Sequence, residues 1–359
     1  MARELDELLK QSSEWLRGTG PLSEIVLSSR IRLARNLERL PFIVRSTRAS
    51  MQEVLDTVKS AVSKVVTLKR AFWFDMSALT EVDRQFLVER HLISREQAGS
   101  PEHRAVVLSQ SEAISVMVNE EDHLRIQVLQ SGLNLRDAWT LGDTLDDELS
   151  ELLPFAYSTD LGYLTCCPTN TGTGMRASVM LHLPSLVMTK QINKVLHTIT
   201  KLGLAARGFY GEGTEASGNF FQISNQVTLG RNEEELIENI ERILKQVIEY
   251  EQGARASLMA NNRTQLEDRV WRALGILRHA RTISSQETLD LLSAVRLGVD
   301  LGLMNGLDRS AVNELFLFSQ PSHLQKLEGK NLSAKDRDVV RAELIRQKLG
   351  IQGKDGKGK

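Results

Sequence analysis

The stretch CCPTNTGTGMRASVMLHLP, residues 166–184, combines a cysteine pair, a proline turn and a glycine-rich loop with an arginine and an apolar run. The apolar run after Arg176 predicts a strand. Gly172 and Gly174 allow the backbone to approach a bound phosphate or substrate closely. The lysine and the spacing of a P-loop are absent, so this is a different kind of glycine-rich loop. Cys167 is either a small buried hydrophobe or a thiolate, for which the polar loop supplies donors.

The segments around this stretch alternate between strand and helix patterns over the first 255 residues or so. Short β-rich runs begin at residues 105, 114 and 124, and their spacing predicts an antiparallel meander. Apolar periodicity predicts helices over 50–66, with a capping box of Ser50 and Glu53, over 185–202, with Ser185 as the cap, and over 233–249, with Asn232 as the cap. We therefore expect an α+β fold in which an antiparallel sheet is flanked by helices.

Beyond residue 255 the pattern is helical throughout. Two segments beginning at residues 284 and 331 each open with a capping residue and continue with apolar periodicity; in the second, Ser333 and Asp336 form the cap pair. We expect residues 1–255 to form the catalytic domain and residues 256–350 an all-α C-terminal domain. The tail, residues 351–359, is polar and glycine-rich, which predicts disorder.

Composition excludes several classes of protein. The formal net charge of −1 gives no overall field that favours nucleic acid or an anionic membrane. No apolar run approaches the roughly 20 residues that span a bilayer, and the N-terminus lacks the apolar block of a secretory signal. The two cysteines are adjacent, so a structural disulfide framework is excluded. We expect a cytoplasmic protein without a membrane span and without direct nucleic-acid binding.

Arginines recur in four segments, three of which lie outside the opening stretch: LSSRIRLARN (27–36), NEEDHLRIQ (119–127) and RGFYGEGTEASGNFFQISNQ (207–226). On a strand, Arg30 and Arg32 would share one face, where neighbouring cations need an anionic partner such as a polyphosphate. An exposed basic edge strand would give the same pattern, and an ion-pair cluster would explain Glu121, His123 and Arg125. Together, however, the segments supply the arginines and glutamates that phosphoryl transfer requires.

The blocks SSRIRLARN, NEEDHLRI, CPTNTGTGMRASV and RGFYGEGTEA resemble, in order and spacing, those of the phosphagen (guanidino) kinases, the family of arginine kinase and creatine kinase. The resemblance covers roughly residues 20–255. Small-molecule members of that family begin with a helical domain that encloses the free substrate, whereas here the first arginine motif already starts at Ser28. The C-terminal helical region and the variant FYGEGTEA are similar to the protein arginine kinase branch, so the resemblance implies arginine side chains of proteins as acceptors.

The resemblance also implies roles for individual residues. Glu121 and Glu212 match the acidic pair that holds the guanidinium, and Cys167, rather than Cys166, matches the reactive cysteine; these three are the expected catalytic residues. ATP is the implied cosubstrate, with Mg²⁺ arriving on the nucleotide, and no carboxylate cluster suggests a metal site of the protein's own. The positions that match the ATP-binding blocks are Ser28, Ser29, Arg30, Ile31, Arg32, His91, Arg125, Arg176, Ala177, Ser178, Val179, Met180, Arg207, Gly208, Phe209, Tyr210, Gly211 and Glu212.

The helical region contains RDVVRA, which is Arg337, Asp338, Val339, Val340, Arg341 and Ala342. From spacing alone this is a solvated face with ion pairs. The resemblance implies instead a motif that binds phosphoarginine as an allosteric or docking site.

Partners are likewise implied only by the resemblance. They are a zinc-binding activator (McsA), a heat-shock repressor (CtsR), the ClpC unfoldase, for which phosphoarginine marks proteins for degradation, and a second copy of the chain. Two alternatives remain open: a small-molecule guanidino kinase and a phosphoarginine-binding adaptor.

Overall fold

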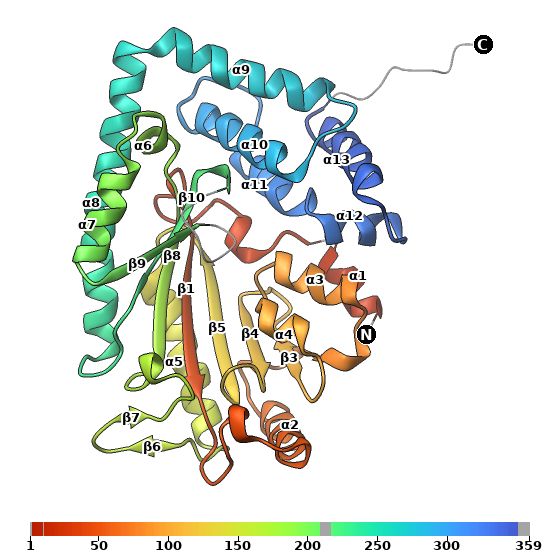
Figure 1. Cartoon of the computed structure of the whole chain (residues 1–359), viewed down its shortest axis with the longest axis vertical. Helices are drawn as coiled ribbons and strands as arrows, with labels where there is room; N and C mark the ends of the chain where they lie inside the picture. Colours follow the sequence, from red (N-terminus) through yellow and green to blue (C-terminus); the bar gives the residue numbers. More distant parts are fainter. Residues whose placement is uncertain (1, 10, 209–216, 351–359) are drawn as a thin grey trace.

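The computed structural model describes residues 2–9, 11–208 and 217–350. Its centre is an antiparallel sheet of eight strands in the order β2-β3-β4-β5-β1-β8-β10-β9 (Figure 1). The predicted meander is confirmed as β3, β4 and β5. The strands are β1 (Val26–Arg35), β2 (Phe72–Asp75), β3 (Ala105–Leu108), β4 (Ile114–Val118), β5 (Leu124–Ser131), β8 (Met175–His182), β9 (Leu204–Gly208) and β10 (Phe220–Asn225), with a separate hairpin of β6 (Tyr157–Ser158) and β7 (Gly162–Tyr163).

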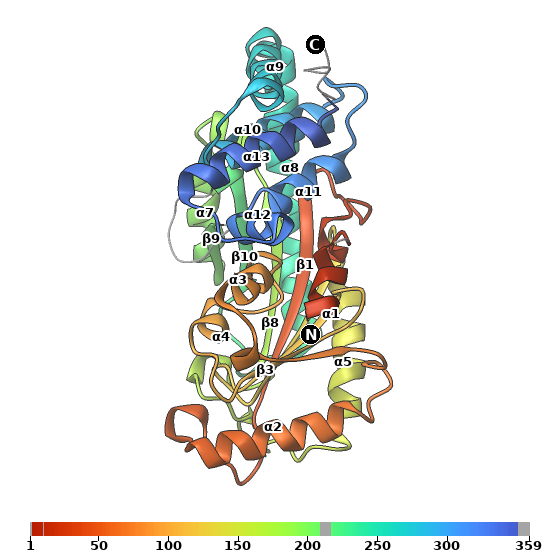
Figure 2. The same ribbon diagram turned by 90° about the vertical axis from the view of Figure 1, so that its right-hand side faces the viewer.

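Helices cover both faces of the sheet, and a helical region lies at one end of it (Figures 1 and 2). None of the helices in the described ranges is long and apolar enough to cross a membrane. The helices are α1 (Ala2–Leu9), α2 (Arg48–Val62), α3 (Glu81–Glu89), α4 (Arg95–Gly99), α5 (Leu135–Ser150), α6 (Pro184–Met188), α7 (Ile192–Lys201), α8 (Glu233–Asn261), α9 (Arg263–His279), α10 (Ser285–Asp300), α11 (Arg309–Phe318), α12 (Pro321–Glu328) and α13 (Ala334–Lys348).

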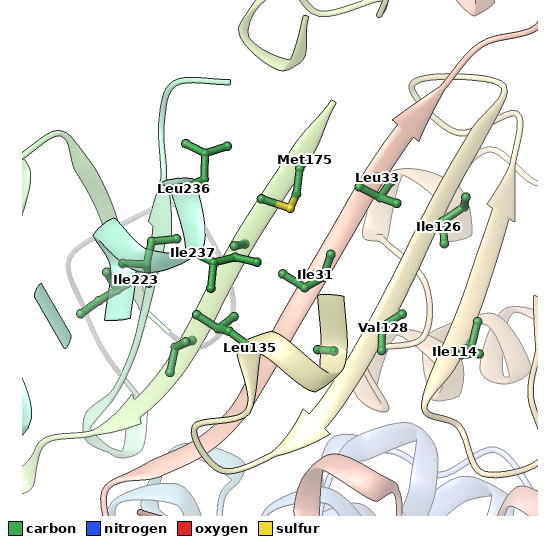
Figure 3. Close-up of a cluster of buried hydrophobic side chains, with 14 of the residues drawn as sticks. Ile31, Leu33, Ile114, Ile126, Val128, Leu135, Met175, Ile223, Leu236 and Ile237 are labelled. Carbon is green, nitrogen blue, oxygen red and sulfur yellow. The ribbon is translucent and has the colours of Figure 1, made fainter. Parts of the chain in front are cut away.

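Strand alternation gives the two faces of the sheet different chemistry. Along β1, Ile31 and Leu33 point to one face and are almost fully buried, whereas Arg30 and Arg32 point to the other. The apolar face packs against α5 and α8, whose Leu135 and other apolar residues complete the main core (Figure 3). Each such buried aliphatic side chain stabilises the fold by about 1.5–3 kcal/mol. The opposite face is thereby left for polar chemistry.

The helical region packs over one end of that opposite face. Leu129, Met180 and Phe220, from β5, β8 and β10, belong to the same apolar cluster as Leu292 and Val295 of α10. Polar contacts reinforce this junction, since the buried His182 ring lies 2.8 Å from Ser293 Oγ. The C-terminal helices therefore bound one end of the polar face.

Two predicted helix boundaries were wrong. The helix predicted over 50–66 begins at Arg48, because Thr47 forms the capping box with Ser50 one turn earlier. The helix predicted over 185–202 is two helices, α6 and α7, because the chain turns at Lys190, whose φ is +58°.

The predicted cap of the third helix is confirmed. Asn232 and Glu235 form a reciprocal capping box at the start of α8. α8 then continues to Asn261, so the chain crosses residue 255 inside a helix. The division into domains at that residue stays a prediction.

Candidate active site

A cleft of about 970 Å³ opens on the polar face of the sheet where β1, β5 and β8 lie side by side. Pairing explains how distant sequence blocks meet here: Arg32 of β1 lies directly opposite Arg176 of β8, and Arg125 of β5 lies opposite Ala34. Arg207 reaches the same cleft from β9. The sheet thus brings together four of the five arginines singled out in the sequence, along with Glu121 and Cys167.

Most of the arginines here form no ion pair within the described residues: Arg125 pairs with Glu120, but Arg30, Arg32, Arg176 and Arg207 have no such partner there. Burial, together with the charges of Arg125 and Arg176, lowers the pKa of Arg30 to about 9. The pKa of Arg32 also falls well below its ordinary value, first through burial and then through repulsion from Arg30 and its neighbours. The Nε atom of Arg32 is buried and has no hydrogen-bond partner among the described residues. Such an arrangement fits a polyanion, which would supply both the missing charge and the missing acceptors.

Two consecutive glutamates in the cleft differ in their surroundings. Glu120 accepts a hydrogen bond from Ser94 and forms an ion pair of 2.6 Å with Arg125. Burial alone would raise the pKa of Glu120, but Arg125 and Ser94 outweigh burial and lower it. Glu121 is exposed to the cleft; the partial burial of its carboxyl group raises its pKa, despite the opposing charge of Arg125. Glu120 is therefore committed to an arginine of the site, while Glu121 is a more basic carboxylate.

The cysteine loop forms the wall of the cleft beside Glu121. The Cys167 sulfur lies 3.0 Å from Thr169 Oγ1, and the Cys167 side chain also hydrogen-bonds with Glu121. The backbone N–H of Cys166 donates to Asp122 at 2.6 Å, which fixes the start of the loop. Burial raises the pKa of the Cys166 thiol. Of the two cysteines, Cys167 is thus the one placed against the carboxylate.

The glycines of this loop have a different use from the one predicted. A Cβ atom on Gly172 would lie 2.6 Å from the Thr228 carbonyl oxygen, and one on Gly174 would lie 2.5 Å from the Arg35 guanidinium. Both glycines have positive φ. The close approach is therefore to the protein itself, and it holds the cysteine loop against the neighbouring segments.

A small pocket lies beside the cleft, between the arginines and the helical region. Arg30 lines it and donates to Gln222 at 2.7 Å. His91 has a pKa lowered to about 3, through burial and then the charge of Arg30, so its ring is neutral. Its ring packs edge-on against Trp15 at 4.9 Å. The pocket is lined by Trp15, Ser28, Arg30, His91, Leu129, Ser178, Met180 and Gln222.

Several predicted site residues lie elsewhere. Ile31, Ala177 and Val179 point into the core, because alternation turns every second residue of β1 and β8 away from the cleft. Ser29 likewise points away and bonds to Gly132. His123 does not share the face of Arg125: its buried ring bonds to the backbone of Leu37 and Pro41. Gly208 is buried at the end of β9, and Phe209, Tyr210, Gly211 and Glu212 lie outside the described residues.

Some residues that the fold brings to the site were not predicted from the sequence. Arg104 lines the cleft and Trp15 lines the small pocket, yet neither belongs to a distinctive block. Glu120 also lines the cleft; it lies within the block NEEDHLRI, but only its neighbour Glu121 was singled out there. A buried seam between α3 and α12 was not predicted either. The His323 ring lies between Glu89 and Arg90. Its Nδ1 atom is 2.8 Å from Glu89 Oε2, and its Nε2 atom is 3.3 Å from Arg90 Nη1. This seam ties the helical region to the residue that precedes His91.

Within RDVVRA the structure separates the two arginines. Arg341 is buried and donates to the carbonyl oxygens of Ser319 and Ile283 and to Asp338. Arg337 is only partly buried and lines a hollow between α3 and α12. The prediction of a solvated ion-pair face is therefore wrong for Arg341, while Arg337 and Asp338 retain access to solvent.

The cleft holds carboxylates but no ready-made cation cage. Within the described ranges, no group of three or more histidine, cysteine, aspartate or glutamate side chains is arranged to bind a metal ion.

Comparison with known proteins gives the class to which this site belongs. Residues 53–254 match the model of the ATP:guanido phosphotransferase C-terminal catalytic domain. A duplicated taurocyamine kinase from Schistosoma mansoni, solved with transition-state analogue components, superposes with a TM-score of 0.58 at 30% identity, over 66% of this chain and 34% of that one. The chain therefore belongs to the ATP:guanido phosphotransferase family.

Both halves of the chain also match one branch of this family, the protein-arginine kinases. Residues 263–358 match the protein-arginine kinase McsB C-terminal domain. The protein-arginine kinase of Desulforamulus reducens is 50% identical over 94% of this chain and 95% of its own length. That of Symbiobacterium thermophilum is 51% identical over 96% and 99%. The resemblance found in the sequence motifs is thus confirmed over nearly the whole chain.

Proposed function

We propose that this protein transfers the γ-phosphoryl group of ATP to arginine side chains of proteins. The observation that carries the proposal is the cleft itself, in which several arginines, all but Arg125 without an ion pair among the described residues, face a basic carboxylate and a thiol. Such a site requires an anionic ligand beside the arginines and a cationic ligand beside the carboxylate and the thiol. A nucleotide triphosphate and a guanidinium meet both needs.

In this proposal, the phosphate chain of the nucleotide is held by five arginines, and His91 lies toward the nucleoside. The five are Arg30, Arg32, Arg125, Arg176 and Arg207. Mg²⁺, bound with the nucleotide, would neutralise charge on the phosphate oxygens. Arginine donors placed before the reaction stabilise the charge that moves onto the leaving oxygen, without reorganisation at that moment. Arg125 is kept in place by its ion pair with Glu120.

The acceptor guanidinium is protonated at neutral pH and is not a nucleophile. Glu121 is proposed to orient it and to accept a proton from the attacking nitrogen as the N–P bond forms. The bond from γ-phosphorus to the bridging oxygen breaks, and ADP leaves. A carboxylate whose pKa is raised is a stronger base than an ordinary one. Cys167 adds negative character beside the guanidinium, and Glu212, outside the described residues, is proposed as the second carboxylate.

The test is incubation with Mg²⁺, ATP and an arginine-rich protein, with free arginine in a parallel reaction. Products are mapped by mass spectrometry without acid, because the N–P bond is acid-labile. We expect phosphate on protein arginines and little on free arginine. Phosphorylation of free arginine alone would make the protein a small-molecule guanidino kinase, and phosphorylation of neither would overturn the proposal.

We also propose that the hollow beside Arg337 binds phosphoarginine. Arg337, Lys326 and Lys330 line this hollow and would supply cations for the phosphate. Asp338, which follows Arg337 in the chain and pairs with Arg341, is proposed to turn its carboxylate to the guanidinium half. Since Arg341 is engaged in the core, Arg337 is the arginine of the motif that meets the phosphate. Arg337→Ala should remove activation by a phosphoarginine protein while ATP binding at the cleft persists. Retained activation would contradict this assignment.

The wider setting is proposed from family membership. We infer a cytoplasmic, homodimeric enzyme that is controlled by an activator of the McsA kind. Its product would mark proteins for a ClpC-dependent protease and relieve repression by CtsR. Co-purification of phosphorylated substrate with the unfoldase, compared with unphosphorylated substrate, tests this step.

A further inference from the structure

A second hollow lies directly behind the catalytic cleft, and the loop after β1 separates the two. Ile43 and Val44 of this loop line the cleft, while Leu40 and Phe42 line the hollow. The hollow has a volume of about 520 Å³. We call it the rear groove; it is lined by Leu37, Glu38, Arg39, Leu40, Pro41, Phe42, Arg45, Ala156, Tyr157 and Leu164.

The rear groove is a built feature, because its two walls are joined by backbone hydrogen bonds. Leu37 bridges Phe155, Glu38 N–H donates to the Pro154 carbonyl at 2.8 Å, and Ala156 N–H donates to the Asn36 carbonyl at 2.8 Å. The β6–β7 hairpin forms the far wall, at the end of the sheet away from the helical region (Figure 1).

The groove is also tied to the chemistry of the cleft. The Asn36 amide donates to Asp122 at 2.6 Å and to the Leu164 carbonyl at 3.0 Å. Asp122 in turn accepts from the N–H of Cys166. One buried carboxylate thus holds together the groove wall, the loop after β1 and the start of the cysteine loop.

Apolar side chains are exposed along the path from cleft to groove. Val44, between the two hollows, is 78% exposed, and Tyr157, on the groove wall, is 60% exposed. Apolar side chains that are exposed near one another mark interaction surfaces. Arg39 and Arg45 are also exposed there and form no ion pair within the described part of the chain. A partner would therefore present apolar and acidic groups.

We propose that the rear groove binds the polypeptide segment that flanks the target arginine, with an apolar side chain of the substrate seated against Tyr157. The proposal rests on the function proposed above, and it follows from continuity. When a substrate polypeptide places its arginine beside Glu121 and Cys167, the residues that flank this arginine meet the rear groove just past Val44. Acidic residues near the target arginine would pair with Arg39 and Arg45.

The test compares two peptides that contain one arginine and differ only in flanking residues, apolar in one and serine in the other. For the wild-type protein we expect a lower KM for the apolar peptide. In Tyr157→Ser, the KM for that peptide should rise about tenfold, equivalent to about 1.4 kcal/mol. The KM for ATP and that for the serine peptide should not change. Trp271→Ser is the matched control, because Trp271 is 50% exposed on α9, far from the groove in sequence.

The outcomes separate the two proposals. If the wild-type protein phosphorylates neither peptide, the proposed function fails. If it phosphorylates both with equal KM, or if Tyr157→Ser matches Trp271→Ser, the function stands and the groove assignment is wrong. A change in oligomeric mass of Tyr157→Ser by light scattering, with KM unchanged, would overturn the assignment in favour of contact with a second copy.

Discussion

Replacing Arg32 by methionine should stabilise the free protein and weaken its binding of ATP. Methionine keeps the unbranched stem of the side chain and removes the charge. Nothing is lost at Nε, which has no hydrogen-bond partner in the described structure. The change also removes repulsion from Arg30, Arg125 and Arg176.

The gain can be estimated from the register of the sheet. Arg32 and Arg176 lie directly opposite each other on β1 and β8. At an effective dielectric constant of 20, two unit charges about 4 Å apart repel by about 4 kcal/mol, and the repulsion falls as the distance grows. Replacing buried ionic groups by apolar ones stabilises proteins by about 1–4 kcal/mol. Because Arg32 is partly exposed, we expect the lower half of that range, about 1–2 kcal/mol.

Thermal unfolding with and without MgATP measures both effects. At about 2–4 °C per kcal/mol, the Tm of free Arg32→Met should rise by roughly 2–8 °C. ATP at about 100 times its Kd stabilises the wild-type protein by about 2.7 kcal/mol. Loss of one phosphate contact worth about 3 kcal/mol weakens binding roughly 100-fold. The same ATP concentration should then stabilise the variant by only about 0.4 kcal/mol.

Arg136→Met is the control for removing an arginine as such. Arg136 lies on α5, is largely exposed and pairs with Glu241 at 3.1 Å, so its loss should change stability by less than about 0.5 kcal/mol and leave the ATP effect intact. If Arg32→Met is less stable than the wild-type protein, its charge is compensated in the free state. If ATP stabilises it as strongly as before, Arg32 is not part of the phosphate site. Either result refutes the reasoning.

Three further predictions concern the cleft and the helical region. Glu121→Gln and Cys167→Ser should each bind ATP with near wild-type affinity by calorimetry but turn over about 10²–10⁴-fold more slowly, as for the loss of an acid–base group; a normal rate in either would remove that residue from the mechanism. In pH profiles, kcat/KM should fall on the acid side as Glu121 is protonated, at a pH above the ordinary glutamate value of 4.5 because burial raises its pKa. On the alkaline side, ATP affinity should fall as pH rises through about 9, where Arg30 loses its charge in the free protein; a flat affinity between pH 8 and 10 would place Arg30 away from the phosphates. Finally, Arg341→Met should lower the free energy of unfolding in urea by about 2–5 kcal/mol, because two buried carbonyl groups lose their donor, whereas Arg337→Met should change it by less than about 1 kcal/mol; equal effects would mean that the two arginines are equivalent.

The fold was predictable where local patterns decide it. The meander of β3, β4 and β5 and the capping box at Asn232 follow from alternation and from a single turn of chain. The boundary between α6 and α7 was not, because residues 185–202 keep an apolar period through Lys190. The positive φ of Lys190 breaks the helix there, and no glycine or proline in the sequence marks this position. The continuation of α8 across residue 255 was not predicted from the sequence either.

The residues of the site also fall into two groups: those that sequence blocks identified, and those that reach the site only through the fold. Distinctive blocks identified Arg32, Arg125, Arg176, Glu121 and Cys167, and the sheet brings them together. The blocks were over-inclusive at Ile31, Ala177 and Val179, although the period-two rule that picked out Arg30 and Arg32 would have excluded them. Residues that reach the site through tertiary structure alone carried no local signal. Arg104 precedes β3 in an ordinary loop, and Trp15 lies in an N-terminal segment that packs against His91.

The arginine cluster also explains why the helical region belongs with the catalytic sheet. A face that carries uncompensated cations cannot be closed by an apolar core along its whole length. The fold buries one end of it under α10, through Leu129, Met180 and Phe220, and leaves the other end open as the cleft. The small pocket with Arg30 and His91 falls at the border of these two zones. The seam of His323, Glu89 and Arg90 also joins the helical region to the residue that precedes His91, so direct contacts connect the C-terminal helices with this pocket.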